Sequence, residues 1–354
     1  SSWSTFSNNI IEISQPYGNL HGIVTEDATI NNNNINLYSW ACNWCSYNGG
    51  GITADRSTIL DNLLDVNLTT CCGGEKYAIQ SNGTEDNRSI IDNNTINSMI
   101  SGSYNTGRGI NAEYADIQNN DINTTGFSVN SGSGNIISFN TLTSNSTAIQ
   151  SGNVASLTIT NNTITSNSTA INLSSSDALI SHNLIESQGR GIEMYNQSGG
   201  EIINNTIVSP NSADYGIHIS NLSAPVVQNN IIEGFTNGIY AENDLQNQFI
   251  QNNNFWDISE DVFSGTAMPA LVGEMIDLNI NGDTCDIYSN LNMDPLFMNP
   301  DSTDYNLQAT SPCINAGNEG GELDPDGTIA DMGAFYYPDP IIDTTIVVNP
   351  VTYN

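Results

Sequence analysis

Apolar and polar residues alternate in short runs along most of this chain, and the runs recur at a spacing of twenty to thirty residues. Residues 157–173, LTITNNTITSNSTAINL, show one unit: an apolar residue, an Asn pair, a second apolar residue and, seven residues later, an Ile preceded by a small residue. The second Asn of each pair gives one aligned column: Asn9, Asn33, Asn62, Asn94, Asn120, Asn140, Asn162, Asn183, Asn205, Asn230 and Asn253. Such internal repetition is typical of a solenoid.

The alternation predicts three short strands and three turns per repeat, because successive residues of a strand face opposite sides. One turn of such a coil, here called a rung, cannot bury its apolar side alone, so rungs must stack. We therefore expect an all-β, right-handed parallel β-helix of about eleven rungs. Stacked Asn amides would form an internal ladder, and Asn also tolerates the left-handed angles of sharp turns. A helical repeat is excluded because the 3.6-residue periodicity is missing.

Interruptions of the repeat predict the domain organisation. We expect the β-helix over residues 1–263, with long loops at 36–50, 66–76, 81–88 and 98–107. Residues 264–337 form a C-terminal cap that continues the solenoid and so covers its end. Residues 338–354 are a linker or a β-prone tail, which either lies on its own rod or adds a strand to a neighbouring copy. Both ends of the rod are expected to be capped.

The formal net charge is −33, from 38 Asp and Glu and 5 Lys and Arg. So few cations cannot neutralise phosphates, and this excludes nucleic acid as a partner. A membrane span is also excluded, since no run of about 18 apolar residues is present. The acidity suits a calcium-bearing or salty exterior, and it would equally keep an Asn-rich rod in solution.

The even number of cysteines indicates disulfides and an oxidising, extracellular location. The six are Cys42, Cys45, Cys71, Cys72, Cys285 and Cys313. The first four lie in matching insertions of neighbouring rungs, so we expect two disulfides between those loops, with the pairing open. A zinc site is the alternative for these four. The remaining two are expected to pair within the C-terminal region.

The C-terminal segment 293–337 resembles the end of secreted right-handed β-helix proteins of Bacteroidota. Its MDPLFMNPDSTDYNLQATSPCINAG and DPDGTIADMGAFYY match the DPLF…DYxL…SPxIxAG…DGxxxDxGA pattern of those proteins. Phe335 and Tyr336 depart from it, because the family usually has Glu there. The resemblance covers about 45 residues. It implies an exported protein that is often anchored at the cell surface or directed at carbohydrate.

The outward positions of the third strand are expected to form one polar row: Thr53, Gln80, Asn111, Asn130, Gln150, Asn172, Glu193, His218 and Tyr240. A polysaccharide could bind along this row beside the long loops. Aromatic faces stack well on sugars, and the candidate glycan-binding residues are Trp40, Trp44, Tyr47, Tyr104, Gln80 and Asn111. The alternative is that these aromatics pack the loops as a small satellite core.

A calcium-assisted polysaccharide lyase acting on uronate-containing glycans is the alternative function. It needs a cation to neutralise the uronate, a base to take the proton and a further positive group. The candidates are Lys76, Arg88, Arg108 and Glu113. A calcium ion, Ca2+, has separate candidate ligands in Asp324, Asp326 and Asp331, since oxygen-rich turns suit this ion; ordinary Asx turns without metal are the alternative.

These observations together favour a secreted or cell-surface structural or adhesive β-solenoid without a catalytic role. We expect it to bind a polysaccharide or surface glycan, or to self-associate, with residues 338–354 joining subunits in a homo-oligomer or filament.

Overall fold

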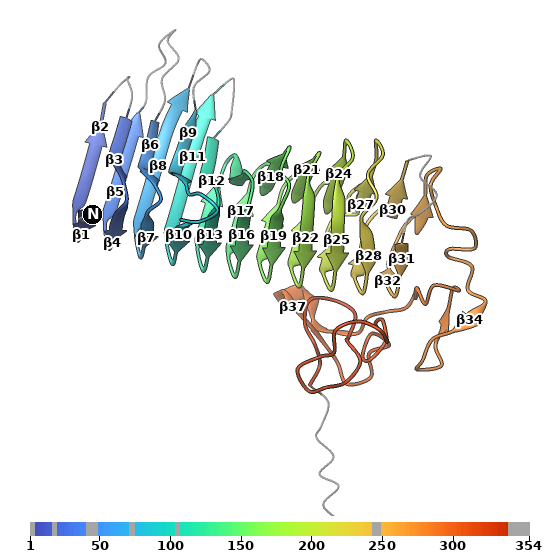
Figure 1. Ribbon diagram of the computed structural model, residues 1–354. Helices are drawn as coiled ribbons and strands as arrows, with labels where there is room; N and C mark the ends of the chain where they lie inside the picture. The colour runs from blue at the N-terminus through green and yellow to red at the C-terminus, as the bar shows by residue number, and fades with distance from the viewer. Residues whose placement is uncertain are drawn as a thin grey trace, which may run out of the picture.

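The protein is a rod of stacked rungs with a smaller module on one side of it (Figure 1). The computed structural model describes residues 4–15, 20–39, 49–70, 75–102, 107–242 and 249–338. Within these ranges, three sheets of eleven strands each build the rod, and every pair of neighbouring strands in them runs parallel. Each sheet takes every third strand of the chain, so one strand of each sheet makes up a rung. The predicted parallel solenoid of about eleven rungs is confirmed.

The strands are short, and the longest ones lie in sheets B and C of the first rungs. Sheet A contains β1 (Ser4–Ser7), β4 (Ala28–Asn31), β7 (Thr58–Leu60), β10 (Ser89–Asp92), β13 (Ala115–Gln118), β16 (Asn135–Ser138), β19 (Leu157–Thr160), β22 (Asp177–Ser181), β25 (Gly199–Ile203), β28 (Val226–Gln228) and β31 (Phe249–Gln251). Sheet B contains β2 (Ile10–Ser14), β5 (Asn34–Ser39), β8 (Leu63–Thr70), β11 (Thr95–Gly102), β14 (Asp121–Thr124), β17 (Thr141–Ser144), β20 (Thr163–Ser166), β23 (Leu184–Ser187), β26 (Thr206–Val208), β29 (Ile231–Glu233) and β32 (Asn254–Trp256). Sheet C contains β3 (Leu20–Glu26), β6 (Gly49–Asp55), β9 (Lys76–Asn82), β12 (Gly107–Glu113), β15 (Phe127–Ser131), β18 (Ile149–Gly152), β21 (Ile171–Ser174), β24 (Ile192–Tyr195), β27 (Tyr215–Ile219), β30 (Asn237–Ala241) and β33 (Phe263–Ser264).

Columns of aliphatic side chains fill the interior of the rod. Ile59, Ile91, Ile117 and Ile137 occupy one position of sheet A in successive rungs, and each is fully buried. Identical residues stack in this way because parallel strands in register place every core position above its counterpart. The burial of each Ile contributes roughly 2 kcal/mol, so a thin core extends the length of the molecule.

The predicted asparagine ladder is present at the turn between sheets A and B. Each ladder amide donates from Nδ2 to Oδ1 of the Asn one rung further on, from Asn9 (2.8 Å to Asn33) to Asn230 (3.0 Å to Asn253). The same Oδ1 also accepts the backbone N–H of its donor residue. Asn290, which the repeat did not reveal, accepts from Asn253 at 3.1 Å and continues the ladder into the C-terminal module.

The left-handed backbone angles belong to the residue before each ladder Asn, not to the ladder Asn itself. Asn93, Asn119 and Asn161 have φ of 53°, 53° and 55°, and His182 has φ of 53°. This corrects the expectation that one Asn serves both purposes. The first Asn of the pair makes the turn, and the second holds the rungs together.

Small residues precede the companion Ile because the backbone of the next rung approaches closely there. A Cβ on Gly191 would lie 2.5 Å from the carbonyl oxygen of Gly216 and 2.5 Å from the Cγ2 of Ile207. The sheet C strand therefore presses against both its neighbour and the core, and Gly, Ala or Ser occupies this column from Gly22 to Gly238.

The C-terminal module, residues 265–338, packs against the outward side of sheet B in the last rungs (Figure 1). It contains two short hairpins, β34 (Asp277–Leu278) with β35 (Thr284–Cys285) and β36 (Phe297–Asn299) with β37 (Asp304–Leu307), and the 3-10 turn η1 (Pro300–Ser302). The apolar seam is formed by Leu184, Val208 and Ile231 of the rod with Phe297 and Tyr305 of the module.

Glu233 is half-buried beside this seam. Its Oε2 is inaccessible to solvent and makes no hydrogen bond. Burial raises the pKa of this carboxyl to about 7, and the carboxylates of Asp294 and Asp257 raise it further. Packing of the C-terminal module therefore favours the protonated, uncharged form of the Glu233 side chain.

The expected disulfide between Cys285 and Cys313 is wrong. Both side chains are buried in the module's apolar cluster as free thiols. Burial raises the pKa of both thiols, so each behaves as a small apolar side chain. Cys42, Cys45, Cys71 and Cys72 lie outside the described residues.

Candidate functional site

The outward side of sheet C carries an unbroken row of polar side chains. Strand register pairs Thr53 with Gln80, Gln80 with Asn111, and so on through Asn130, Gln150, Asn172, Glu193, His218 and Tyr240. All of these side chains are half-buried. The predicted row is therefore one continuous surface feature that crosses nine rungs, each about 4.8 Å from the next.

The central part of the row contains two hydrogen-bonded stretches, Asn111–Asn130 and Gln150–Asn172–Glu193. Asn130 Nδ2 donates to Asn111 Oδ1 at 2.7 Å, and Gln150 Nε2 donates to Asn172 Oδ1 at 3.2 Å. Asn172 Nδ2 in turn donates to Glu193 Oε2 at 2.8 Å. Because each amide has more donors and acceptors than these bonds use, the row can still bind a polar ligand.

An aromatic platform ends the row on β27 and β30. The rings of His218 and Tyr240 are stacked, with centroids 4.9 Å apart and planes at 5°. The Tyr215 ring lies 5.2 Å from His218 and 5.4 Å from Tyr240, tilted against both. Three rings from two neighbouring rungs thus form an aromatic cluster, in which His218 and Tyr240 cover each other's facing sides and the remaining ring faces and edges are left to contact a ligand.

Arg190 and Glu193 border the platform and neutralise each other. Arg190 Nη1 donates to Glu193 Oε1, and the guanidinium carbon lies 5.7 Å from the centroid of the Tyr215 ring. His218 Nδ1 is 3.7 Å from Glu193 Oε1, beyond hydrogen-bond range. Burial and the charge of Arg190 lower the pKa of His218 to about 4, and they outweigh the Asp214 carboxylate, which favours a protonated ring. The platform is therefore uncharged at neutral pH.

A polar hollow of about 280 Å³ lies beside Asn111 and Asn130 of the row, at the C-terminal ends of β9, β12 and β15. Asn82, Asn111, Glu113 and Asn130 line it with Gly132. A Cβ on Gly132 would lie 2.1 Å from the Cγ of Glu113, so glycine gives the Glu113 side chain its room. Platform, amide row and hollow form one polar strip, here called the sheet C strip.

Two family-model matches, at residues 77–224 and 149–290, fit the description "right handed beta helix region", and together they span more than half of the chain. The chain belongs to the right-handed β-helix family. The sequence-based prediction of that fold is thereby confirmed, and the family match says nothing about which ligand this β-helix takes.

Solved structures offer only distant likenesses to this β-helix. The Dettilon tailspike protein aligns at 13% identity and a TM-score of 0.40, over 75% of this chain and 60% of that one. The A-module of the mannuronan C-5 epimerase AlgE6 from Azotobacter vinelandii aligns at 10% identity and a TM-score of 0.32, over 75% and 78%. The A-module of AlgE4 from the same organism aligns at 12% and 0.22, over 68% and 88%. The β-helix spans about 60% of the length of the tailspike. No curated protein matches its sequence significantly.

The four candidate lyase residues do not meet at one point of the β-helix. Strand register aligns Lys76 with Gly107 of the next rung and, through the preceding rung, with the buried Leu20, whose side of the strand faces inward. Arg108 is aligned with Tyr77, one position further along the strand. Because strand side chains alternate, Lys76 and Arg108 point to opposite sides of sheet C. Lys76 is only 7% exposed, and burial lowers its pKa to about 8.

The other two lyase candidates lie at the far end of the strands. Glu113 is five residues beyond Arg108 on β12, a separation of roughly 16 Å at about 3.3 Å per residue. Arg88 is held at the turn between sheets C and A, where it binds the Asp116 carboxylate at 2.6 Å and the Gly134 carbonyl at 2.7 Å. The structure therefore brings together Gln80 and Asn111, but not the proposed lyase set.

The candidate calcium ligands accept backbone N–H groups. Asp331 accepts from Asn315 and Tyr337, at 2.7 and 2.6 Å, and Asp324 accepts from the backbone of Asp331 at 2.9 Å. Asp326 accepts from Thr328. Within the described ranges, no three His, Cys, Asp or Glu side chains gather to hold a metal ion. Calcium binding remains a prediction.

Several further expectations concern residues outside the described ranges. Trp40, Trp44, Tyr47 and Tyr104 are among these, as is nearly all of the tail 338–354. Of the helices in the described part of the chain, none has the length and apolarity needed to cross a bilayer.

The platform is the part of the site that sequence reasoning missed. The repeat predicts Glu193, His218 and Tyr240 as members of the row, but it does not point to Arg190 or Tyr215. The available clue was the change of the row from amides to charged and aromatic residues over three consecutive repeats.

Proposed function

We propose that this β-helix is an extracellular or cell-surface protein with a structural or adhesive role, and that it binds a glycan along the sheet C strip. The proposal rests on one observation: the external amide row continues, in unbroken strand register, into the Tyr215–His218–Tyr240 platform. Amides pair with sugar hydroxyls as donors and acceptors, and aromatic faces stack on the C–H faces of sugar rings.

The shape of the strip favours a polymer over a small molecule. The row crosses successive rungs in a straight line, so equivalent groups recur about every 4.8 Å along it. A chain of repeating sugars can use such a surface many times, and weak single contacts then add up. The adhesive role needs only this binding, with no catalytic group.

Screening a glycan array and then measuring the affinity of the best oligosaccharide by calorimetry tests the proposal. Tyr240→Ala and Asn130→Ala should each weaken binding, Tyr240→Ala by about tenfold if stacking contributes roughly 1.4 kcal/mol. Thr158→Ala, at an outward position of sheet A, is the matched control and should leave affinity unchanged.

Equal affinity of Tyr240→Ala and Thr158→Ala would refute the location of the site. Release of products from the bound glycan, seen as new reducing ends or as absorbance near 235 nm, would remove the non-catalytic role and favour the lyase alternative.

A further inference from the structure

We infer that the ligand of the sheet C strip is a neutral, hydroxyl-rich polysaccharide and not a polyanion. This inference rests on the proposed function, because it names the class of glycan that the same strip binds. It follows from the placement of every cation in the chain and from the balance of charge at the platform.

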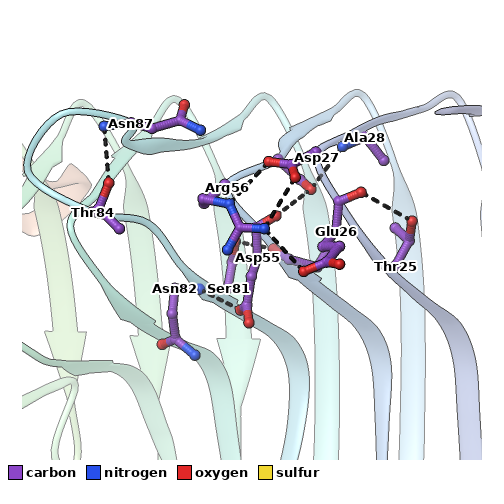
Figure 2. A network of polar contacts seen from close by, with 12 residues as sticks. Thr25, Glu26, Asp27, Ala28, Asp55, Arg56, Ser81, Asn82, Thr84 and Asn87 are labelled. Carbon is purple, nitrogen blue, oxygen red and sulfur yellow. Dashed lines mark hydrogen bonds and ion pairs between the residues drawn. The ribbon is translucent and has the colours of Figure 1, made fainter. Parts of the chain in front are cut away.

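All five Lys and Arg residues of the sequence lie in the described ranges. Each of them is either paired with a carboxylate or buried. Figure 2 shows Arg56 between Glu26 and Asp27. Its guanidinium nitrogens lie 2.9 Å from a carboxylate oxygen of each residue. The remaining arginines have these partners: Arg88 binds Asp116, Arg108 binds Glu75, and Arg190 binds Glu193. Lys76 faces inward and is 7% exposed.

A carboxylated or sulfated polymer would therefore find no group to neutralise it on the strip. Glu193 and Glu113 are the charged side chains that such a polymer would meet at the platform and at the hollow, apart from the paired Arg190. The net charge of −33 adds a general repulsion of polyanions. Recognition of a polyanion normally requires the opposite arrangement, with unpaired arginines or lysines aimed at the ligand.

A neutral glycan suits the same surface. The row offers amide N–H donors and C=O acceptors, which match hydroxyl groups that both donate and accept. The His218 and Tyr240 rings, stacked on each other, add uncharged aromatic contact area to the row. Neither contact requires an ion on the ligand, so salt should hardly affect binding.

Calorimetry of the full chain with three neutral polymers (a β-glucan, a xylan and a galactomannan) and two anionic ones (alginate and polygalacturonate) tests the inference, at 50 and 500 mM NaCl. We expect a neutral polymer to bind with affinities that agree within twofold at the two salt concentrations. The anionic polymers should bind at least tenfold more weakly at 50 mM NaCl.

The variant Glu193→Gln makes the test specific to the platform. It should release Arg190 and raise the affinity for polygalacturonate severalfold at 50 mM NaCl. Glu201→Gln, which removes the same charge from an exposed position on sheet A, is the control and should leave that affinity unchanged. An equal effect of the two variants would show that net charge alone excludes the polyanion, and would overturn the assignment to the platform.

The outcomes separate this inference from the proposed function. Tight, salt-sensitive binding of an anionic polymer to the wild-type protein would overturn the neutral class while leaving glycan binding intact. Absence of binding to all five polymers, together with an empty glycan array, would overturn the proposed function itself.

Discussion

Removal of one ladder amide should destabilise the rod far more than its small size suggests. Asn120 is 1% exposed. Its Nδ2 donates to the carbonyls of Ile91 and Gln118, at 2.9 and 2.8 Å, and to Asn140 Oδ1 at 2.9 Å. Its Oδ1 accepts the backbone N–H and the Nδ2 of Asn94, both at 3.0 Å. Asn120→Ala therefore removes five hydrogen bonds from a site that water does not reach.

The magnitude follows from the groups left behind. A typical internal hydrogen bond contributes about 0.5–1.5 kcal/mol net, and an unpaired buried donor costs about 1–3 kcal/mol. Asn94 keeps two bonds from its Nδ2, but its backbone N–H loses its acceptor. We expect Asn120→Ala to lower the free energy of unfolding by about 3–5 kcal/mol.

Urea unfolding followed by circular dichroism measures this loss, and amide hydrogen exchange shows where it acts, since solenoid rungs contact only their neighbours. Asn119→Gly is the matched control. Asn119 is exposed, and its φ of 53° suits glycine, so the cost should stay below about 1 kcal/mol. Similar losses for both variants would refute the ladder as a source of stability.

Three further predictions concern the C-terminal region. The pKa of Glu233 rises on folding from 4.5 to about 7, so the free energy of unfolding should fall as the pH rises from 5 to 8. Glu233→Gln should therefore raise Tm by about 2–4 °C at pH 8 and hardly at pH 5, and an equal shift at both pH values would contradict this. If Asp324, Asp326 and Asp331 bind calcium, the Tm should be higher in calcium than in a chelator, and Asp326→Asn should abolish that difference. A wild-type Tm that is the same in both solutions argues against the site. If the tail joins subunits, deletion of residues 338–354 should leave monomers by light scattering, and assemblies that persist would refute tail docking.

The repeat made the architecture predictable because each rung obeys the same local rule. The column from Asn9 to Asn253 and the row from Thr53 to Tyr240 both follow from the period of two within strands and the recurrence between rungs. Register in such a solenoid is fixed by stacking, so counting residues from each Asn pair places side chains on one line.

Features outside the repeat could not be derived in this way. Which Asn of the pair takes the left-handed φ could not be derived, because Asn tolerates that angle at both positions. The opposite orientation of Lys76 and Arg108, by contrast, does follow from the repeat, since Lys76 lies three residues before Ile79 and Arg108 only two before Ile110. Asn290 lies 37 residues beyond Asn253, in a segment without the repeat, so its place in the ladder depends on the path of the module.

A crystal structure with the tightest-binding neutral oligosaccharide tests the central claim most directly. Density for the sugar chain should lie along sheet C, with one ring over His218 and Tyr240 and hydroxyls within hydrogen-bond distance of Asn130 and Gln150. Density on sheet A, on the C-terminal module or at the end of the rod, with the sheet C strip empty, would contradict the claim.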